Sequence, residues 1–214
     1  MVRNESLVGK RRIFVLIYVN AMARTPSNML ALGTTAPDFD LPDTRTQQFY
    51  EWKDIQGSQG TLIVFICNHC PFVIHLIEPL VALSNDYLKK GIGIAFISSN
   101  DVLHYPQDGP EEMQKFADKY GMEFPYLYDE SQQTAIDYQA ACTPDFYLFN
   151  DQKELVYRGQ FDDSRPGNAI AVTGQSLREA MDQLLHGNPP VTEQKPSLGC
   201  NIKWKSENLP PDHC

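Results

Sequence analysis

The strongest pattern of apolar residues lies at positions 61–73, where the sequence reads TLIVFICNHCPFV. The five consecutive apolar residues at 62–66 are typical of a strand that is buried on both faces of a sheet. A helix is predicted directly afterwards, because four apolar residues recur at helical spacing: Val73, Leu76, Ile77 and Leu80. The strand stops where Cys67 begins a turn, and Cys70 is expected in the first turn of the helix.

Helices and strands alternate along the rest of the chain. The helix after the cysteines is expected to bend at Pro79 and to end at Gly91. A second buried strand at 92–97 then calls for a right-handed parallel crossover. The later pattern predicts a helix from Pro110 to Gly121, strands at 124–128, 146–149 and 154–159, a short helix at 131–138, and a helix at 177–185 with a capping box at 176–179. This order predicts one α/β domain with a central mixed β-sheet flanked by helices.

The composition of the chain divides it into three parts. Residues 24–188 form the predicted domain, and residues 189–214 shift to proline, charged and polar residues, which predicts a tail outside the core. Residues 1–23 place basic residues before an apolar run at 13–19, as a secretory signal does. That run is short and Met22 is a plausible start codon, so we expect a dispensable or mis-called extension and a cytoplasmic protein. Export to the periplasm is the alternative.

The overall composition narrows the class of protein. The 214 residues are 42% hydrophobic, which suits a single domain with a sizeable core. The formal net charge is −9, which argues against binding to nucleic acids or anionic membranes, because both favour basic surfaces. No apolar run approaches the roughly 18 residues that span a bilayer, so no integral membrane segment is expected.

Cys67 and Cys70 carry the main candidate chemistry. At the start of a helix, free backbone N–H groups and the helix dipole stabilise a thiolate, which is the nucleophile in disulfide exchange. We therefore expect Cys67 as an exposed nucleophile and Cys70 as the resolving thiol. A structural zinc site is the alternative, but the other cysteines form no second pair: Cys142, Cys200 and Cys214. Redox chemistry with no metal and no cofactor is the favoured interpretation.

His69 lies between the two cysteines and is expected to tune their chemistry. A partly charged imidazole beside the Cys67 sulfur would stabilise the thiolate and make the disulfide more oxidising. The alternative is a histidine that points to solvent and does little.

A second motif, Thr143-Pro144, stands just before the buried strand at 146–149. Proline belongs at the first residue of a strand or at an edge, because it cannot donate a backbone hydrogen bond to the sheet. A cis peptide bond at this position would be a deliberate structural feature.

These motifs resemble the thioredoxin superfamily, and more closely its peroxiredoxin-like AhpC/TSA (redoxin) branch. The resemblance covers about residues 22–204 and rests on four stretches: CNHCPFV, TPDFYLF, LVYRGQFDDSRPGN and PSLGCNIKW. It implies a thioredoxin-like fold. It also implies that Cys67 is the nucleophile, Cys70 the resolving cysteine and Pro144 a cis-proline packed against them.

The resemblance extends the candidate site beyond the dithiol. Asn68 lies inside the motif, Thr143 precedes the proline and Cys142 is near the dithiol, although a small buried hydrophobic residue is the other interpretation of Cys142. Arg158 is a candidate for orienting an acidic group, and Cys200 for a mobile third thiol. The implied partners are protein or small-molecule disulfides and thiols, together with an electron donor.

One feature of the sequence departs from the peroxiredoxin pattern. Peroxiredoxins carry a Pro-x-x-x-Thr/Ser-x-x-Cys motif, whereas Val64 stands three residues before Cys67 and Gly60 stands seven before. The hydroxyl that binds peroxide is therefore absent from its usual place. A dithiol–disulfide oxidoreductase is the favoured interpretation, and a thiol peroxidase is the alternative. A copper or other metal chaperone using Cys67, Cys70 and a histidine is the third hypothesis.

Overall fold

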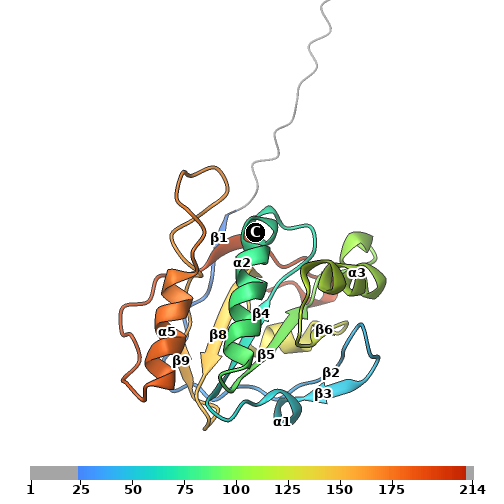
Figure 1. The fold of residues 1–214 in the computed structure, drawn as a ribbon. Helices are drawn as coiled ribbons and strands as arrows, with labels where there is room; N and C mark the ends of the chain where they lie inside the picture. Colours follow the sequence, from blue (N-terminus) through green and yellow to red (C-terminus); the bar gives the residue numbers. More distant parts are fainter. Residues whose placement is uncertain (1–23, 211–214) are drawn as a thin grey trace, which may run out of the picture.

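The computed structural model describes residues 24–210 (Figure 1), so the hypotheses on residues 1–23 and on Cys214 lie outside the described residues. The centre of the domain is a five-stranded sheet with the order β6-β5-β4-β8-β9. Its strands are β4 Gly60–Phe65, β5 Ile92–Ser98, β6 Tyr126–Tyr128, β8 Asp145–Phe149 and β9 Leu155–Tyr157. Strands β4, β5 and β6 are parallel, and β8 is antiparallel to β4 and β9. The sheet is mixed, as predicted.

Helices cover both faces of this sheet. Helices α2 Pro71–Leu88, α3 Pro110–Tyr120 and α5 Gln175–Leu185 pack on one face, and the short helices α1 Trp52–Ile55 and α4 Gln133–Asp137 pack on the other. Successive side chains of a strand point to opposite faces, so Leu62 and Val64 join the first core while Ile63 and Phe65 join the second. The apolar run at 62–66 is therefore buried on both faces, as its composition predicts.

The element boundaries depart from the predictions at α5. This helix starts at Gln175, with Gly174 in the left-handed region at its N-terminus, and the predicted capping box at 176–179 does not form. Asp162 instead accepts hydrogen bonds from the backbone N–H groups of Thr173 and Gly174, each at 2.7 Å. A side chain from the preceding loop thus fixes the backbone just before the helix.

Two smaller sheets complete the structure. Strands β2 Asp40–Pro42 and β3 Phe49–Glu51 form a hairpin, and β1 Thr25–Pro26, β10 Leu198–Asn201 and β7 Cys142–Thr143 form an antiparallel sheet in the order β1-β10-β7. Two 3-10 turns are also present, at Pro106–Asp108 and Ser206–Asn208.

Strand β10 corrects the prediction that residues 189–214 are a tail outside the core. Its backbone pairs with a strand on each side, and Ile202, just beyond it, is 2% exposed within the core. The polar composition of this segment does not predict the pairing, because backbone hydrogen bonds do not depend on the pattern of side chains. The strand also lies directly beside the candidate site.

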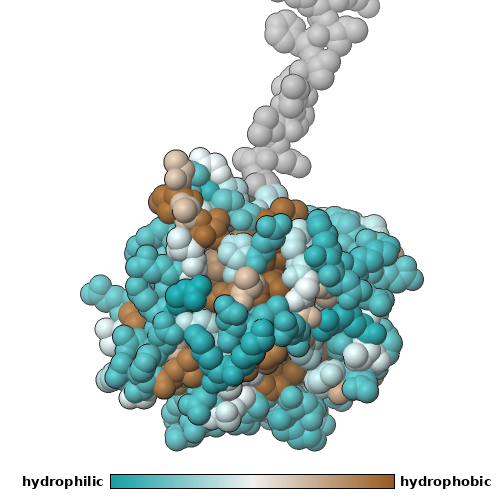
Figure 2. All heavy atoms as spheres, viewed as in Figure 1, coloured by the Kyte–Doolittle hydropathy of each residue, from teal (hydrophilic) through white to brown (hydrophobic). Residues whose placement is uncertain are grey.

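The outer surface is largely hydrophilic in the view of Figure 2, in keeping with the net charge of −9. Apolar atoms gather along the middle of this face, over α2. Within residues 24–210, no helix combines the length and the apolar character needed to cross a bilayer.

Candidate active site

The dithiol lies on the turn between the central strand and the longest helix. Strand β4 ends at Phe65 and α2 begins at Pro71, which suits the first helical position because its ring fixes φ and it lacks a donor that would be unpaired there. Cys70 therefore occupies the N-cap position, one residue before the first turn in which it was expected. Cys67 is 1% exposed and Cys70 0%, so the prediction of an exposed nucleophile is wrong in this conformation.

Thr143 holds both cysteines. Its hydroxyl lies 3.4 Å from the Cys67 sulfur, and its carbonyl accepts a hydrogen bond from the Cys70 thiol at 3.1 Å. The Thr143–Pro144 bond is cis, as the sequence predicts. The Ser197 hydroxyl donates to the Pro144 carbonyl at 2.6 Å, so the segment before β10 helps to fix this backbone.

The pKa values of the two thiols move in opposite directions. The pKa of Cys67 is raised well above its ordinary value, first by its hydrogen bond with Cys70, then by burial and by the nearby charge of Asp108. Hydrogen bonds from Cys200 and Cys67 lower the pKa of Cys70 to about 2, against the effect of burial. These directions make Cys70 the more acidic of the two thiols, whereas the sequence suggested Cys67.

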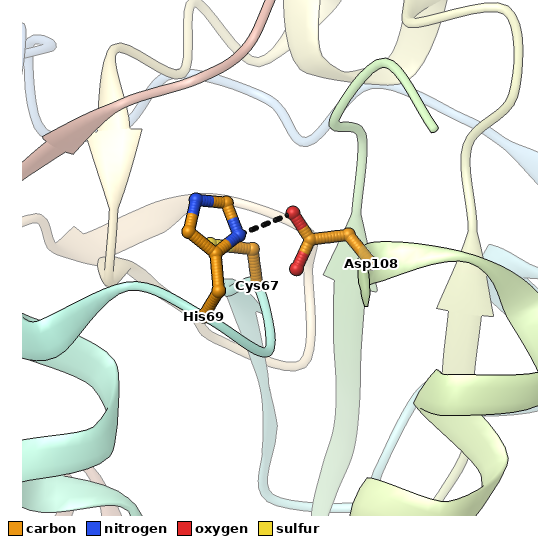
Figure 3. Close-up of side chains that lie close together, drawn as sticks. All are labelled: Cys67, His69 and Asp108. Carbon is orange, nitrogen blue, oxygen red and sulfur yellow. Dashed lines mark hydrogen bonds and ion pairs between the residues drawn. The ribbon is translucent and has the colours of Figure 1, made fainter. Parts of the chain in front are cut away.

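Asp108 is a buried carboxylate that the sequence analysis did not select. It is 0% exposed and accepts hydrogen bonds from the Asn68 backbone N–H and from the Asn100 side chain, both at 2.8 Å. The His69 Nδ1 atom lies 2.7 Å from Oδ2 of Asp108, the oxygen that also accepts from Asn100 (Figure 3). The signal available in the sequence is the position of this residue in a polar loop at the carboxyl end of a buried strand, where open α/β sheets place their binding groups.

His69 is oriented toward this carboxylate rather than freely into solvent. Its ring stacks on that of Tyr105, with the ring centroids 5.6 Å apart and the planes 6° from parallel. Asn68 fixes the same turn from its other side, because its amide donates to the Gln107 carbonyl at 2.9 Å and accepts from the Tyr126 hydroxyl at 3.1 Å. The residues between the two cysteines are thus anchored to the loop at 105–108.

Cys67, His69 and Asp108 also form a set of donors that suits a metal ion. One ligand atom from each lies within 4.8 Å of the others. An ion bound there would have to replace the hydrogen bond between His69 and Asp108, and the set differs from the one suggested by the sequence, which contained Cys70. The Cys70 thiol instead faces the Thr143 carbonyl.

Arg158 and Cys142 lie in the core beside the site rather than on its surface. Arg158 is 0% exposed, pairs with Asp145 at 3.1 Å and stacks 3.9 Å from the centre of the Tyr147 ring. It does orient an acidic group, but that group is the buried Asp145 next to Pro144. The Cys142 thiol points to the Pro144 carbonyl at 3.6 Å, and burial raises its pKa well above the ordinary value. Both positions fit a structural role.

Replacing Arg158 with methionine is expected to lower the free energy of unfolding at neutral pH by about 3–5 kcal/mol, because it leaves the buried Asp145 carboxylate without its partner.

Burial raises the pKa of Asp145 to about 6, although Arg158 opposes this. A carboxyl with a raised pKa contributes stability below its ordinary pKa, and that contribution is lost as the pH rises through about 6. Chemical denaturation should therefore show a smaller loss near pH 5 than near pH 7. The exposed substitution R178M is the control. An equal loss at both pH values would contradict the ion-pair explanation.

The comparisons with known proteins identify the family of this chain. The AhpC/TSA family model matches residues 32–158, more than half of the chain, and the chain belongs to this family. An uncharacterized conserved protein from Geobacillus kaustophilus is 52% identical, and its crystal structure matches with a TM-score of 0.85 over 86% of this chain and 98% of that chain.

Two further relatives carry names that refer to redox chemistry. Thiol-disulfide oxidoreductase ResA from Halalkalibacterium halodurans is 26% identical over 125 residues, which span 58% of this chain and 65% of ResA, just under two thirds of its length. The thioredoxin domain of a thiol-disulfide oxidoreductase from Bacteroides vulgatus is 16% identical, with a TM-score of 0.53 over 71% of this chain and 98% of that domain. The second likeness shows the fold alone, and the predicted thioredoxin-like fold is confirmed.

Proposed function

We propose that this protein is a thiol-disulfide oxidoreductase and that Cys67 and Cys70 form its redox pair. The observation that carries the proposal is the contact of both sulfurs with one residue, Thr143, on the turn from β4 to α2. Each thiol also shifts the pKa of the other, as close neighbours do, so a disulfide can form without a large movement of the chain. The names of the relatives support the same class of reaction.

The reaction begins at Cys67. Its thiol loses a proton to solvent, and the Cys67 thiolate attacks a substrate disulfide. The attack forms a mixed disulfide with Cys67 and releases the first substrate sulfur as a thiolate. This thiolate takes the proton from Cys70, and Cys70 then attacks the Cys67 sulfur. A Cys67–Cys70 disulfide forms and the second substrate sulfur leaves, so the substrate gains the two electrons that the protein loses.

The test compares the two activities that the family suggests. We expect catalysis of insulin reduction by dithiothreitol and little consumption of hydrogen peroxide, since the residue three before Cys67 is the fully buried, apolar Val64. Protein disulfides and small-molecule disulfides can be compared as substrates in the same assay. Fast peroxide consumption without insulin reduction would favour the peroxidase, and a stoichiometric metal in the purified protein would favour the chaperone.

Removing His69 is expected to raise the pKa of Cys67 and to make the disulfide less oxidising. The reason is that the Asp108 charge, which already raises this pKa, would lose a hydrogen-bond donor. The rate of Cys67 alkylation is measured as a function of pH in wild type and H69A. The reduction potential of each protein is measured by equilibration with glutathione. H186A, which removes an exposed histidine at the C-cap of α5, is the control. Unchanged values in H69A would show that His69 has no influence on the dithiol.

A further inference from the structure

Strand β10 brings a third cysteine to the dithiol. Cys200 is the register partner of Thr143, the residue that contacts Cys67 and Cys70. Helix α2, which begins next to Cys70, packs against β10, and Cys200 packs against the apolar core that contains both cysteines. The thiols of Cys200 and Cys70 are close enough to shift each other's pKa in opposite directions. Cys67, Cys70 and Cys200 therefore lie together around Thr143.

The sequence around Cys200 is adapted to this close approach. A Cβ atom on Gly199 would lie 2.1 Å from the Thr143 carbonyl oxygen, a distance that real Cβ contacts essentially never show. Only glycine lets β10 lie this near the cis-proline segment, because a side chain would push the strand away. The position of the Cys200 sulfur thus depends on the residue before it.

The three cysteine residues differ in their exposure to solvent. Cys67 and Cys70 are 1% and 0% exposed, whereas Cys200 is only partly buried. A reductant that approaches from solvent therefore reaches Cys200 more easily than the pair behind it, and access is one of the factors that set the rate of disulfide exchange.

We propose that Cys200 is a third redox thiol. It attacks the buried Cys67–Cys70 disulfide and replaces it with a Cys70–Cys200 disulfide, which a reductant in solvent reaches more easily. The proposal rests on the function proposed above. The Cys200 thiolate attacks the Cys70 sulfur, a Cys70–Cys200 disulfide forms, and Cys67 leaves as a thiolate. This step moves no net electrons. A dithiol reductant then attacks Cys200, releases Cys70, and closes its own disulfide by attacking the mixed disulfide, which frees Cys200.

The state of Cys70 controls when Cys200 is reactive. In the reduced protein the pKa of Cys200 is raised, first by its hydrogen bond to Cys70 and then by burial. When Cys70 is part of a disulfide, its sulfur no longer has this interaction with the Cys200 thiol, so the main cause of that increase is removed. The charge of Lys203 lowers the pKa of Cys200. Cys200 thus becomes a better nucleophile when there is a disulfide to open.

The first test asks which disulfide forms when Cys67 is absent. C67S is oxidised with diamide, free thiols are alkylated in acid, and the peptides are mapped by mass spectrometry. We expect a Cys70–Cys200 disulfide. Cys142 is the internal comparison, because it is also buried near Cys70 but its thiol faces the Pro144 carbonyl. A Cys70–Cys142 link, or no intramolecular link to Cys70, would overturn the proposal.

A second variant keeps Cys200 but moves it, and so tests whether its position matters. G199A keeps the sulfur but displaces β10, so C67S/G199A should form the Cys70–Cys200 disulfide more slowly than C67S, with a far-ultraviolet circular dichroism spectrum like that of C67S. An unchanged rate of Cys70–Cys200 formation would show that the pairing does not depend on the arrangement described here, and would count against the proposal.

The third test distinguishes this proposal from the function on which it rests. C200S should still form the Cys67–Cys70 disulfide, but dithiothreitol should reduce that disulfide severalfold more slowly than in wild type. A wild-type rate in C200S would overturn the role of Cys200 and leave the dithiol in place. Failure of wild type and C200S to form the Cys67–Cys70 disulfide would instead refute the proposed function.

Discussion

Replacing Cys67 with serine is expected to reduce the rate of disulfide exchange by roughly a hundredfold or more, because the sulfur that attacks the substrate is lost. Replacing Cys70 with serine should have a different result. Cys67 can still form a mixed disulfide in C70S, but the residue that resolves it is missing. Incubation of C70S with insulin, followed by non-reducing electrophoresis and mass spectrometry, should therefore show a covalent complex through Cys67.

This pair of variants decides between the two possible nucleophiles. Cys70 is the more acidic thiol, as suits a nucleophile, whereas its position behind Cys67 at the N-cap favours the resolving role. A complex trapped through Cys70 in C67S, with none in C70S, would reverse the assignment. C142S is the folding control for a buried cysteine, compared by thermal unfolding only.

Replacing Asp108 with asparagine is the second change with a large expected effect. The carboxylate charge raises the pKa of Cys67, so its removal should lower that pKa and increase the alkylation rate of Cys67 near neutral pH. The variant should also be less stable by about 1–3 kcal/mol, because an amide cannot accept from Asn68, His69 and Asn100 together.

Two measurements check this prediction against a matched control. Peptide mapping after alkylation at several pH values reports the pKa of Cys67 alone, and urea denaturation reports the stability. D118N makes the same chemical change at an exposed position of α3 and should alter neither quantity. A Cys67 pKa that stays the same or rises in D108N would show that the buried charge does not control this thiol.

The parts of the fold that the sequence predicts are those with a dense apolar pattern. The five apolar residues at 62–66 are typical of a strand covered on both faces, and the spacing from Val73 to Leu80 predicts α2 behind the cysteines. The cis bond before Pro144 is implied by the family resemblance of the TPDFYLF stretch. Each of these features is local in sequence.

The features that the sequence analysis missed depend on tertiary contacts. Four residues, LGCN, form β10, and nothing in them indicates a strand until the backbone pairs with β1 and β7. Asp108 looks like a solvated loop residue in the sequence, but Asn68, His69 and Asn100 surround it once the loop folds back over the dithiol. The burial of Cys67 has the same origin, since neighbours distant in sequence cover it.

The most direct test of the central claim is a redox titration of the wild-type protein in buffers of reduced and oxidised dithiothreitol. Free thiols are alkylated at each point, and the disulfide-linked peptides are identified by mass spectrometry. The account predicts a two-electron transition in which a Cys67–Cys70 disulfide is populated on oxidation and lost reversibly on reduction. A protein in which Cys67 and Cys70 stay reduced throughout, or in which Cys67 is oxidised without Cys70, would contradict it.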